Sequence, residues 1–272
     1  MNKKQWLATP YFIWALAFIL IPLGIIIYYG FTDKNGAFTL YNIMQITRPE
    51  NAKALGLALL LSLIATLLCL VLAYPLAMIL SQMNVNQTSF IVLIFILPMW
   101  MNFLLRTLAW QTILEKNGVL NSILSFFHLP HVHIINTPAA IILGMVYNFL
   151  PFMVLPIYNV LLKLDKDVVN ASRDLGANGI QTFTKIIFPL SIPGVISGIM
   201  MVFIPSLTTF VISTILGGSK ILLIGNVIEQ EFTQGSNWRV GSGLSFVLMI
   251  FILFSMLVML KYDKDGDGGA LL

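Results

Sequence analysis

The sequence predicts an all-α protein that crosses a membrane several times, and three observations carry that prediction. Hydrophobic residues make up 58% of the 272 residues and charged residues only 10%, a far more apolar balance than water-soluble domains have. The mean hydropathy is +0.91. The apolar residues gather in runs of about 20 or more, the length at which a helix crosses roughly 30 Å of hydrocarbon. We therefore expect a polytopic membrane protein that forms one domain over residues 1–272.

Six apolar runs are long enough to be transmembrane helices. They are residues 10–31, 54–81, 89–111, 137–162, 189–216 and 240–261. The first run is rich in aromatic residues and no small-residue cleavage site follows it, so we expect a retained helix and not a signal peptide. Prolines inside these runs predict kinks and not helix ends, because neighbouring helices can satisfy the freed carbonyls. These prolines are Pro22, Pro75, Pro98, Pro151, Pro156 and Pro205.

The distribution of lysine and arginine predicts the orientation. If both termini lie on one side, that side holds eight Lys and Arg residues against six on the other. The excess of positive charge in cytoplasmic loops then places both termini, and the link 163–189, in the cytoplasm. Residues 262–272 predict a flexible tail. The stretch "DKDGDG" within this tail imitates the first half of a calcium loop, but no glutamate follows it to complete the loop.

Several function classes are excluded by motifs and charges that the sequence lacks. All eleven carboxylates fall in loops, tails or span ends, whereas a proton-coupled pump needs buried ionisable groups. The sequence contains no G-x-x-x-x-G-K-[ST] phosphate loop and no G-x-S-x-G motif or paired Asp of an intramembrane protease. The net charge of +4 fits lysines and arginines that flank spans in the lipid bilayer, without nucleic acid. We expect a transport subunit powered by a partner, not an enzyme, with an ungated channel as the alternative.

The link 163–189 is unusually polar for this chain, and it predicts a short helix. Asp165 or Asp167 can cap the start of the helix, and Gly176 can end it in a left-handed conformation. Small and apolar residues recur with helical spacing at Val168, Ala171, Ser172 and Leu175, and a second series runs through Ile180, Phe183 and Ile187. Such a stripe fits a helix that lies in the groove of a partner. The alternative is an interfacial helix that rests on lipid headgroups.

The same link resembles the "EAA" loop of ABC importer permeases. The matching residues are Asn170-Ala-Ser-x-x-Leu-Gly-Ala177, followed by Phe183 and by Pro189-Leu190. The family pattern has Glu and Ala where this chain has Asn170 and Ser172. The stretches "LPMWMNFLLRTLAW", "GMVYNFLPFMVLPIY" and "LGGSKILLIGNVIEQEF" are similar to the spermidine/putrescine permeases of that family.

This resemblance implies a type I ABC importer permease fold with six transmembrane helices and a cytoplasmic coupling helix. It implies three kinds of partner: a second homologous permease, ABC ATPase subunits and an extracytoplasmic solute-binding protein. ATP and Mg would be held by the ATPase, and this chain would hold no cofactor. The residues implied in coupling to the ATPase are Val168, Asn170, Ala171, Ser172, Asp174, Leu175, Gly176 and Ala177. The implied substrate is a polyamine; the alternative within the class is another solute, such as an anion, a thiamine-like cation or an iron complex.

A path for a polyamine needs aromatic faces for the methylene stems and ammonium groups, together with a few carbonyls or carboxylates. Our candidates are Trp100, Asn102, Trp110, Tyr147, Asn148, Glu229 and Glu231. The alternative is that these aromatic residues are interfacial anchors or helix packing. In the polyamine family the segment before the paired glycines often carries an Asp, whereas residues 212–218 read "ISTILGG". More of the cation's coordination is then expected from the partner permease.

Three further features carry smaller expectations. We expect Arg106 to extend toward the outer headgroups, with an ion pair to Glu115 or Glu229, or a place in the path, as alternatives. The histidines in "HLPHVH" lie close together in the sequence, but their spacing is not that of a metal site and we expect no metal. The spacing Gly194-x-x-x-Gly198 predicts close helix packing.

Overall fold

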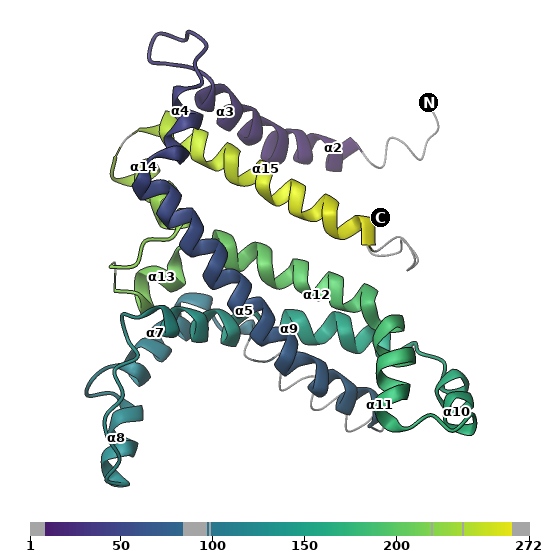
Figure 1. Ribbon diagram of the computed structural model, residues 1–272. Helices are drawn as coiled ribbons and strands as arrows, with labels where there is room; N and C mark the ends of the chain where they lie inside the picture. Colours follow the sequence, from purple (N-terminus) through teal and green to yellow (C-terminus); the bar gives the residue numbers. More distant parts are fainter. Residues whose placement is uncertain (1–8, 84–96, 98, 219, 236, 263–272) are drawn as a thin grey trace.

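The computed structural model describes residues 9–83, 97, 99–218, 220–235 and 237–262. Within them the chain is helical, apart from turns, loops and one isolated bridge between Thr32 and Phe38. The all-α prediction is therefore confirmed for the described residues. Five helical runs are long and apolar enough to cross a membrane, and Figure 1 shows how they are arranged.

The first run is continuous although it contains a π-helical turn. It consists of α2 (Thr9–Ala15), the turn η1 (Leu16–Leu20) and α3 (Ile21–Gly30). A short outer segment, α4 (Tyr41–Met44) and η2 (Gln45–Thr47), leads into the second run, α5 (Pro49–Gln82). After residues 84–96 the chain forms α7 (Phe103–Leu114) and α8 (Val119–Phe126), and then the run α9 (Pro138–Leu162).

In the second half of the chain, the described residues form two more long runs and three separate short helices. A loop carries α10 (Lys166–Asp174), and the next run joins α11 (Gly179–Thr182), the π-turn η3 (Phe183–Ile187) and α12 (Phe188–Thr208). The short helices α13 (Val211–Leu216) and α14 (Ile224–Thr233) connect this run to the last one, α15 (Trp238–Tyr262).

Four of the six predicted spans agree with these runs to within a few residues. The first part of the predicted span 89–111, residues 89–96, lies outside the described residues, together with Pro98, and α7 covers its final part. Because α5 and α9 begin at the same end of the bundle (Figure 1), the chain returns across it between Gln82 and Pro138. As predicted, Pro75 and Pro205 lie inside helices, as do both prolines of α9.

The predicted boundaries of the fifth span, 189–216, were wrong at both ends. The helix begins at Gly179, because α11 and η3 continue into α12 without a break. It ends at Thr208, where Thr209 takes an extended conformation and α13 starts as a separate helix. The close approach of α14 accounts for this end: a Cβ on Gly225 would lie 2.6 Å from the Thr208 carbonyl oxygen. The sequence around Thr208 does not predict this contact, because its partner Gly225 belongs to another helix.

The core lies between α5, α9 and α12. The two helices α9 and α12 run antiparallel and pack closely along their length. A Cβ on Gly194 would lie 2.9 Å from the Pro156 carbonyl oxygen, and one on Gly198 would lie 2.7 Å from Met153 Sδ. The prediction of close packing at this glycine pair is therefore confirmed, in keeping with the use of small residues where membrane helices meet.

A second layer consists of α3 and α15, which lie side by side in Figure 1. These two helices meet at Gly30 and Gly243, where a Cβ on Gly30 would lie 3.5 Å from the Gly243 Cα. The first run is 0% buried over its most apolar window, whereas α9 is 56% buried. The start of α2 and the end of α15 lie at the same end of the molecule as α10 (Figure 1). The α10–α11 loop therefore shares its end of the bundle with both ends of the described chain.

Candidate functional site

The α10–α11 loop forms the helix that the polar link predicts. Asp165 caps α10, because its Oδ1 accepts from the backbone N–H of Asp167 at 2.9 Å. Gly176 ends the helix with φ +86°, and the next backbone N–H, of Ala177, returns to the Ser172 carbonyl at 3.0 Å. Both end signals are therefore confirmed, and Asp165 is the cap of the two candidates. A capping box between Asn178 and Gln181 then starts α11.

The apolar residues of this loop face away from the rest of the chain. Leu175 is 89% exposed and Ile180 is 76% exposed. Val168 and Ala171 are exposed as well, as are Asn170 and Asp174 at the polar edge. Ala177 is half-buried. Nothing in the described chain covers Leu175 or Ile180, so this surface is apolar and unpartnered.

Ser172 is the member of the predicted stripe that turns inward. Its side chain is buried, and its hydroxyl lies 3.3 Å from that of Thr182, which is also buried. This contact connects α10 to α11. Ser172 therefore holds the loop together and contributes nothing to its exposed face.

The loop is joined to the bundle by aromatic rings that the sequence pattern did not reveal. Phe183 packs edge-on against Tyr74 of α5, with ring centroids 5.5 Å apart at 89°. The Tyr74 hydroxyl is hydrogen-bonded to the Ser191 hydroxyl of α12 at 2.6 Å. The available signal was a hydroxyl-bearing ring beside Pro75 in an otherwise apolar run. Its partner lies 117 residues away, and helical spacing cannot predict a contact over that distance.

Two of the predicted path residues, Trp110 and Tyr147, meet between α7 and α9, and Asn148 is the chain neighbour of Tyr147. The rings of Trp110 and Tyr147 meet edge-on, with centroids 5.2 Å apart. The neighbouring Asn148 is 1% exposed, and its Nδ2 donates to the Gly144 carbonyl at 2.9 Å. Its Oδ1 is buried and has no hydrogen-bond partner. We name this aromatic pair, together with the free buried acceptor of Asn148, the outer cluster.

The remaining path candidates lie apart from the outer cluster. Trp100 is 81% exposed. Asn102 caps α7, since its Oδ1 accepts from the Leu104 N–H at 2.8 Å. Glu229 and Glu231 of α14 line different cavities: Glu229 faces one of about 550 Å³ with Phe210 and Phe232, and Glu231 one of about 650 Å³ between α5, α14 and the start of α15.

The expectation for Arg106 was wrong, because the side chain is buried within the chain and does not extend to the headgroups. It is 8% exposed, and its Nε has no hydrogen-bond partner. Within the described residues it forms no ion pair with Glu115 or Glu229. The face of α7 that carries Arg106 and buried Thr107 packs toward α13 and α9, while Leu104 and Leu105 are exposed.

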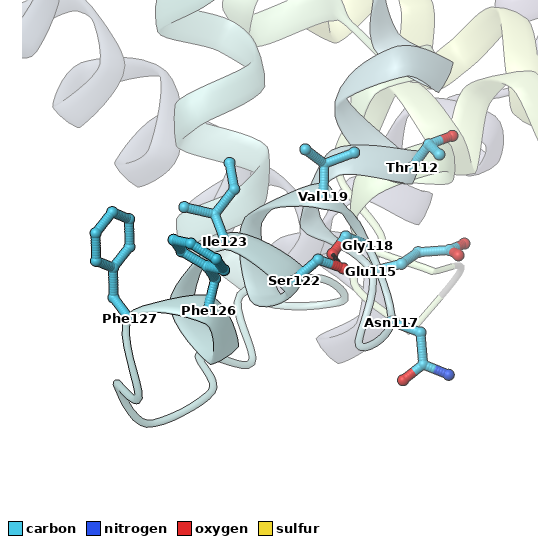
Figure 2. A pocket seen from close by; sticks show the side chains of 9 residues that line it. All are labelled: Thr112, Glu115, Asn117, Gly118, Val119, Ser122, Ile123, Phe126 and Phe127. Carbon is cyan, nitrogen blue, oxygen red and sulfur yellow. Dashed lines mark hydrogen bonds between the residues drawn. The ribbon is translucent and has the colours of Figure 1, made fainter.

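The helices α7 and α8 lie at the end of the bundle opposite α10 (Figure 1) and line an open pocket of about 550 Å³. Figure 2 shows Phe126 and Phe127 at one side of this cavity and Glu115 and Asn117 at the other. The loop between α8 and α9 carries the three histidines, and His131 Nε2 lies 2.6 Å from the Ser125 hydroxyl. Across the residues that the structure describes, no group of three potential metal ligands occurs.

Comparison with known proteins gives a consistent result. The family model of the binding-protein-dependent transport system inner membrane component matches residues 4–263. The spermidine/putrescine transport system permease protein PotB of Haemophilus influenzae is 36% identical over 97% of this chain and 95% of its own. PotB of Escherichia coli is 38% identical over 90% of this chain and 92% of its own. A PotB homolog of Mycoplasma genitalium is 32% identical over 87% and 82%.

Solved structures show the same fold at low sequence identity. A bacterial ABC transporter that imports the acidic polysaccharide alginate superposes with a TM-score of 0.77, at 18% identity, over 95% of this chain and 96% of that chain. The same kind of transporter in complex with an alginate pentasaccharide-bound periplasmic protein gives a TM-score of 0.78, at 17% identity, over 96% of both chains.

Proposed function

We propose that the chain, which belongs to the family of inner membrane components of binding-protein-dependent transport systems, is a permease subunit of an ATP-driven polyamine importer. Family members are transport subunits and not enzymes. The choice of spermidine and putrescine as substrates is supported by the relatives that carry those names at 36% and 38% identity over at least 90% of this chain. The observation that carries the proposal is the apolar, uncovered face of the α10–α11 loop.

The exposed face of this loop fits a groove on an ATPase subunit. Leu175 and Ile180 are 89% and 76% exposed, and burying one such side chain is worth about 2 kcal/mol. The flanking Asn170 and Asp174 supply a polar edge, as protein interfaces commonly have. Lipid headgroups are the alternative contact, but the loop forms two capped helices around the buried Ser172–Thr182 contact. An ordered apolar surface of this kind favours a protein partner over lipid headgroups.

The position of the loop fixes the rest of the proposed arrangement. If the ATPase binds there, that end of the bundle faces the cytoplasm, and both ends of the described chain lie on the same side (Figure 1). ATP and Mg are held by the ATPase. The solute-binding protein then meets the opposite end, formed by α8, α13 and α14, and a second permease completes the pore in the bacterial cell membrane.

The outer cluster is the proposed contribution of this chain to the substrate path. Trp110 and Tyr147 offer ring faces to ammonium groups and methylene stems. The buried Oδ1 of Asn148 has no hydrogen-bond partner, and it becomes an acceptor for an amine N–H when a helix movement exposes it. Arg106 lies one turn before Trp110 on α7 and repels cations. The second permease is therefore proposed to supply carboxylates that offset Arg106 and hold the amines.

Reconstitution of the complete complex tests this function. The chain, a second permease, an ATPase and a binding protein are placed together in proteoliposomes, and uptake of labelled spermidine and putrescine is measured with and without ATP. Uptake should require ATP and all four components, and the chain alone should hydrolyse no ATP. Stoichiometric hydrolysis by the chain alone, or solute flux without ATP, would contradict the proposal. Uptake of a different solute with no polyamine uptake would retain the permease and reject the substrate.

A further inference from the structure

The contact between the α10–α11 loop and the bundle is a small cluster that we name the Tyr74 clasp. It consists of Tyr74 of α5, Phe183 of η3, and Phe188 and Ser191 of α12. The three rings lie within 6.1 Å of one another, centroid to centroid. The two hydroxyls are 2.6 Å apart. Tyr74 is 7% exposed and Ser191 is fully buried, so water does not compete for this hydrogen bond.

The clasp lies where the helix backbones on both sides are interrupted. Pro75 follows Tyr74 directly, and Pro189 and Pro193 flank Ser191. A proline has no N–H, so each one removes a hydrogen bond from its helix. The π-turn η3, which begins at Phe183, adds a further irregularity of the kind that is frequent at functional sites. Side-chain contacts therefore hold together a region where the backbone ladder is weakest.

A continuous series of contacts leads from α10 to the clasp. Ser172 of α10 touches the hydroxyl of Thr182, and Thr182 is followed directly by Phe183, whose ring rests on Tyr74. Just beyond Ser191, α12 is pressed against α9 at Gly194. A displacement of α10 is therefore transmitted through the Tyr74 clasp to α5 and to α12, which is packed against α9.

We propose that Tyr74 is a positioning residue that transmits movement of the α10–α11 loop to α5 and α12. This inference rests on the proposed function, since it assumes that an ATPase moves the loop. The ring of Tyr74 follows Phe183, and its hydroxyl holds Ser191, so α5 and α12 move together when the loop moves. Without the hydroxyl the ring still fills its place, but α12 slides past α5, and ATP is hydrolysed without matched transport.

The test compares variants that remove the hydrogen bond and keep the packing. Tyr74→Phe, Ser191→Ala and the double variant are assembled with the ATPase, the second permease and the binding protein in proteoliposomes. Complex assembly, basal ATPase activity and solute moved per ATP hydrolysed are measured for each. We expect assembly and basal ATPase activity to be retained, and solute moved per ATP to fall at least fivefold. Both single variants break the Tyr74–Ser191 hydrogen bond, and Ser191→Ala also removes the bond from the Ser191 hydroxyl to the Phe188 carbonyl. The double variant should therefore be no worse than Ser191→Ala.

Tyr158→Phe is the matched control, because it removes the hydroxyl of a half-buried tyrosine on α9. It should leave the transport ratio at the wild-type value. An unchanged ratio in Tyr74→Phe would overturn the proposal, as would additive losses in the double variant. Loss of assembly in both single variants would overturn it too, since the contact would then serve folding alone. If the wild-type complex shows no ATP-dependent uptake at all, the proposed function fails and not the clasp in particular.

Discussion

Two short helix pairs connect the long helices at opposite ends of the bundle. One pair buries its apolar residues, and the other leaves them exposed. At the end opposite α10, α13 and α14, which we name the outer pair, join α12 to α15, and at the other end the α10–α11 loop joins α9 to α12 (Figure 1). In the outer pair Ile212, Leu216 and Ile224 are 0% exposed. In the α10–α11 loop the comparable apolar residues, Leu175 and Ile180, are 89% and 76% exposed.

The outer pair is held by the buried amide of Asn226. Its Nδ2 donates to the Phe210 carbonyl at 3.1 Å and to the Thr214 hydroxyl at 2.8 Å. Its Oδ1 accepts from the Ser213 hydroxyl and from the Leu223 N–H. Every hydrogen-bonding position of the amide side chain is therefore used within the chain. The α10–α11 loop has one buried side-chain pair, Ser172 and Thr182, and leaves its apolar face open.

This contrast shows which loop requires a partner. The outer pair satisfies its own polar groups and buries its own apolar residues, so its stability belongs to the chain. The α10–α11 loop is ordered by caps and a single buried contact. Its exposed apolar face can therefore gain free energy only by binding another subunit. Substitutions in the two regions should therefore separate stability from assembly.

The largest effect is expected for Asn226→Leu, which removes all four hydrogen bonds of the Asn226 amide side chain. A buried group left without its partner costs about 1–3 kcal/mol, and the buried backbone N–H of Leu223 would lose the Asn226 oxygen as its acceptor. We expect a loss of about 3 kcal/mol or more in the free energy of unfolding. Thermal unfolding in detergent measures it, with Asn170→Leu on the exposed face of α10 as the control. Equal unfolding midpoints for Asn226→Leu and Asn170→Leu would contradict the proposed difference in stability between the outer pair and the α10–α11 loop.

The next effect concerns assembly and not stability. Leu175→Ser should weaken binding of the ATPase by about 2 kcal/mol, or roughly 30-fold, because the side chain is 89% exposed in the free chain. The unfolding midpoint should not change. Titration of the purified ATPase against the permease in nanodiscs measures the affinity. The control is Leu257→Ser at a site on α15, outside the α10–α11 loop, where the side chain is 66% exposed. Equal affinities for both variants would place the docking surface elsewhere.

A matched pair of glycines sharpens the comparison at the level of the backbone. Gly176 and Gly218 both have positive φ, at +86° and +61°, so alanine costs about 1 kcal/mol in either position. A Cβ on Gly176 meets nothing within 4 Å, whereas one on Gly218 would overlap the side-chain oxygen of Asn136. Gly218→Ala should therefore lower the unfolding midpoint more than Gly176→Ala does, as thermal unfolding in detergent can measure.

The charged variant Gly176→Asp separates the two roles of that turn. It adds the same strain and places a carboxylate beside the docking face, so ATPase recruitment and uptake should fail while the chain still inserts into the membrane. Wild-type uptake and recruitment in Gly176→Asp would show that the face does not dock.

The smallest effect is expected in the outer cluster. Replacing Tyr147 or Trp110 by Leu keeps an apolar side chain and removes a ring face, and a cation–π contact is worth about 1 kcal/mol. The apparent KM for spermidine should rise about fivefold with assembly intact. The control is Tyr11→Leu in the first helix, where the tyrosine side chain is 64% exposed. Unchanged uptake kinetics in both cluster variants would assign Trp110 and Tyr147 to helix packing.

Much of this architecture is already determined by local sequence. The lengths of the apolar runs determine the long helices at α5, α9 and α15, because a helix must satisfy its own backbone in lipid. Asp165 and Gly176 determine the ends of α10, since a cap needs only a side-chain acceptor at one end and a left-handed residue at the other. The exposed stripe through Val168 and Leu175 also follows from helical spacing. Each of these features depends on residues within a few positions of one another.

Tertiary structure alone decided the rest, because the interactions join residues that are far apart in the chain. Arg106 turns inward because α13 and α9 cover its face of α7. The helical run that includes α12 ends at Thr208, where Gly225 of α14 packs against the Thr208 carbonyl. Tyr74 meets Ser191, and Trp110 meets Tyr147, only when the helices pack. Sequence periodicity specifies which face of a helix is apolar, but which helix covers that face depends on the packing energy of the whole bundle.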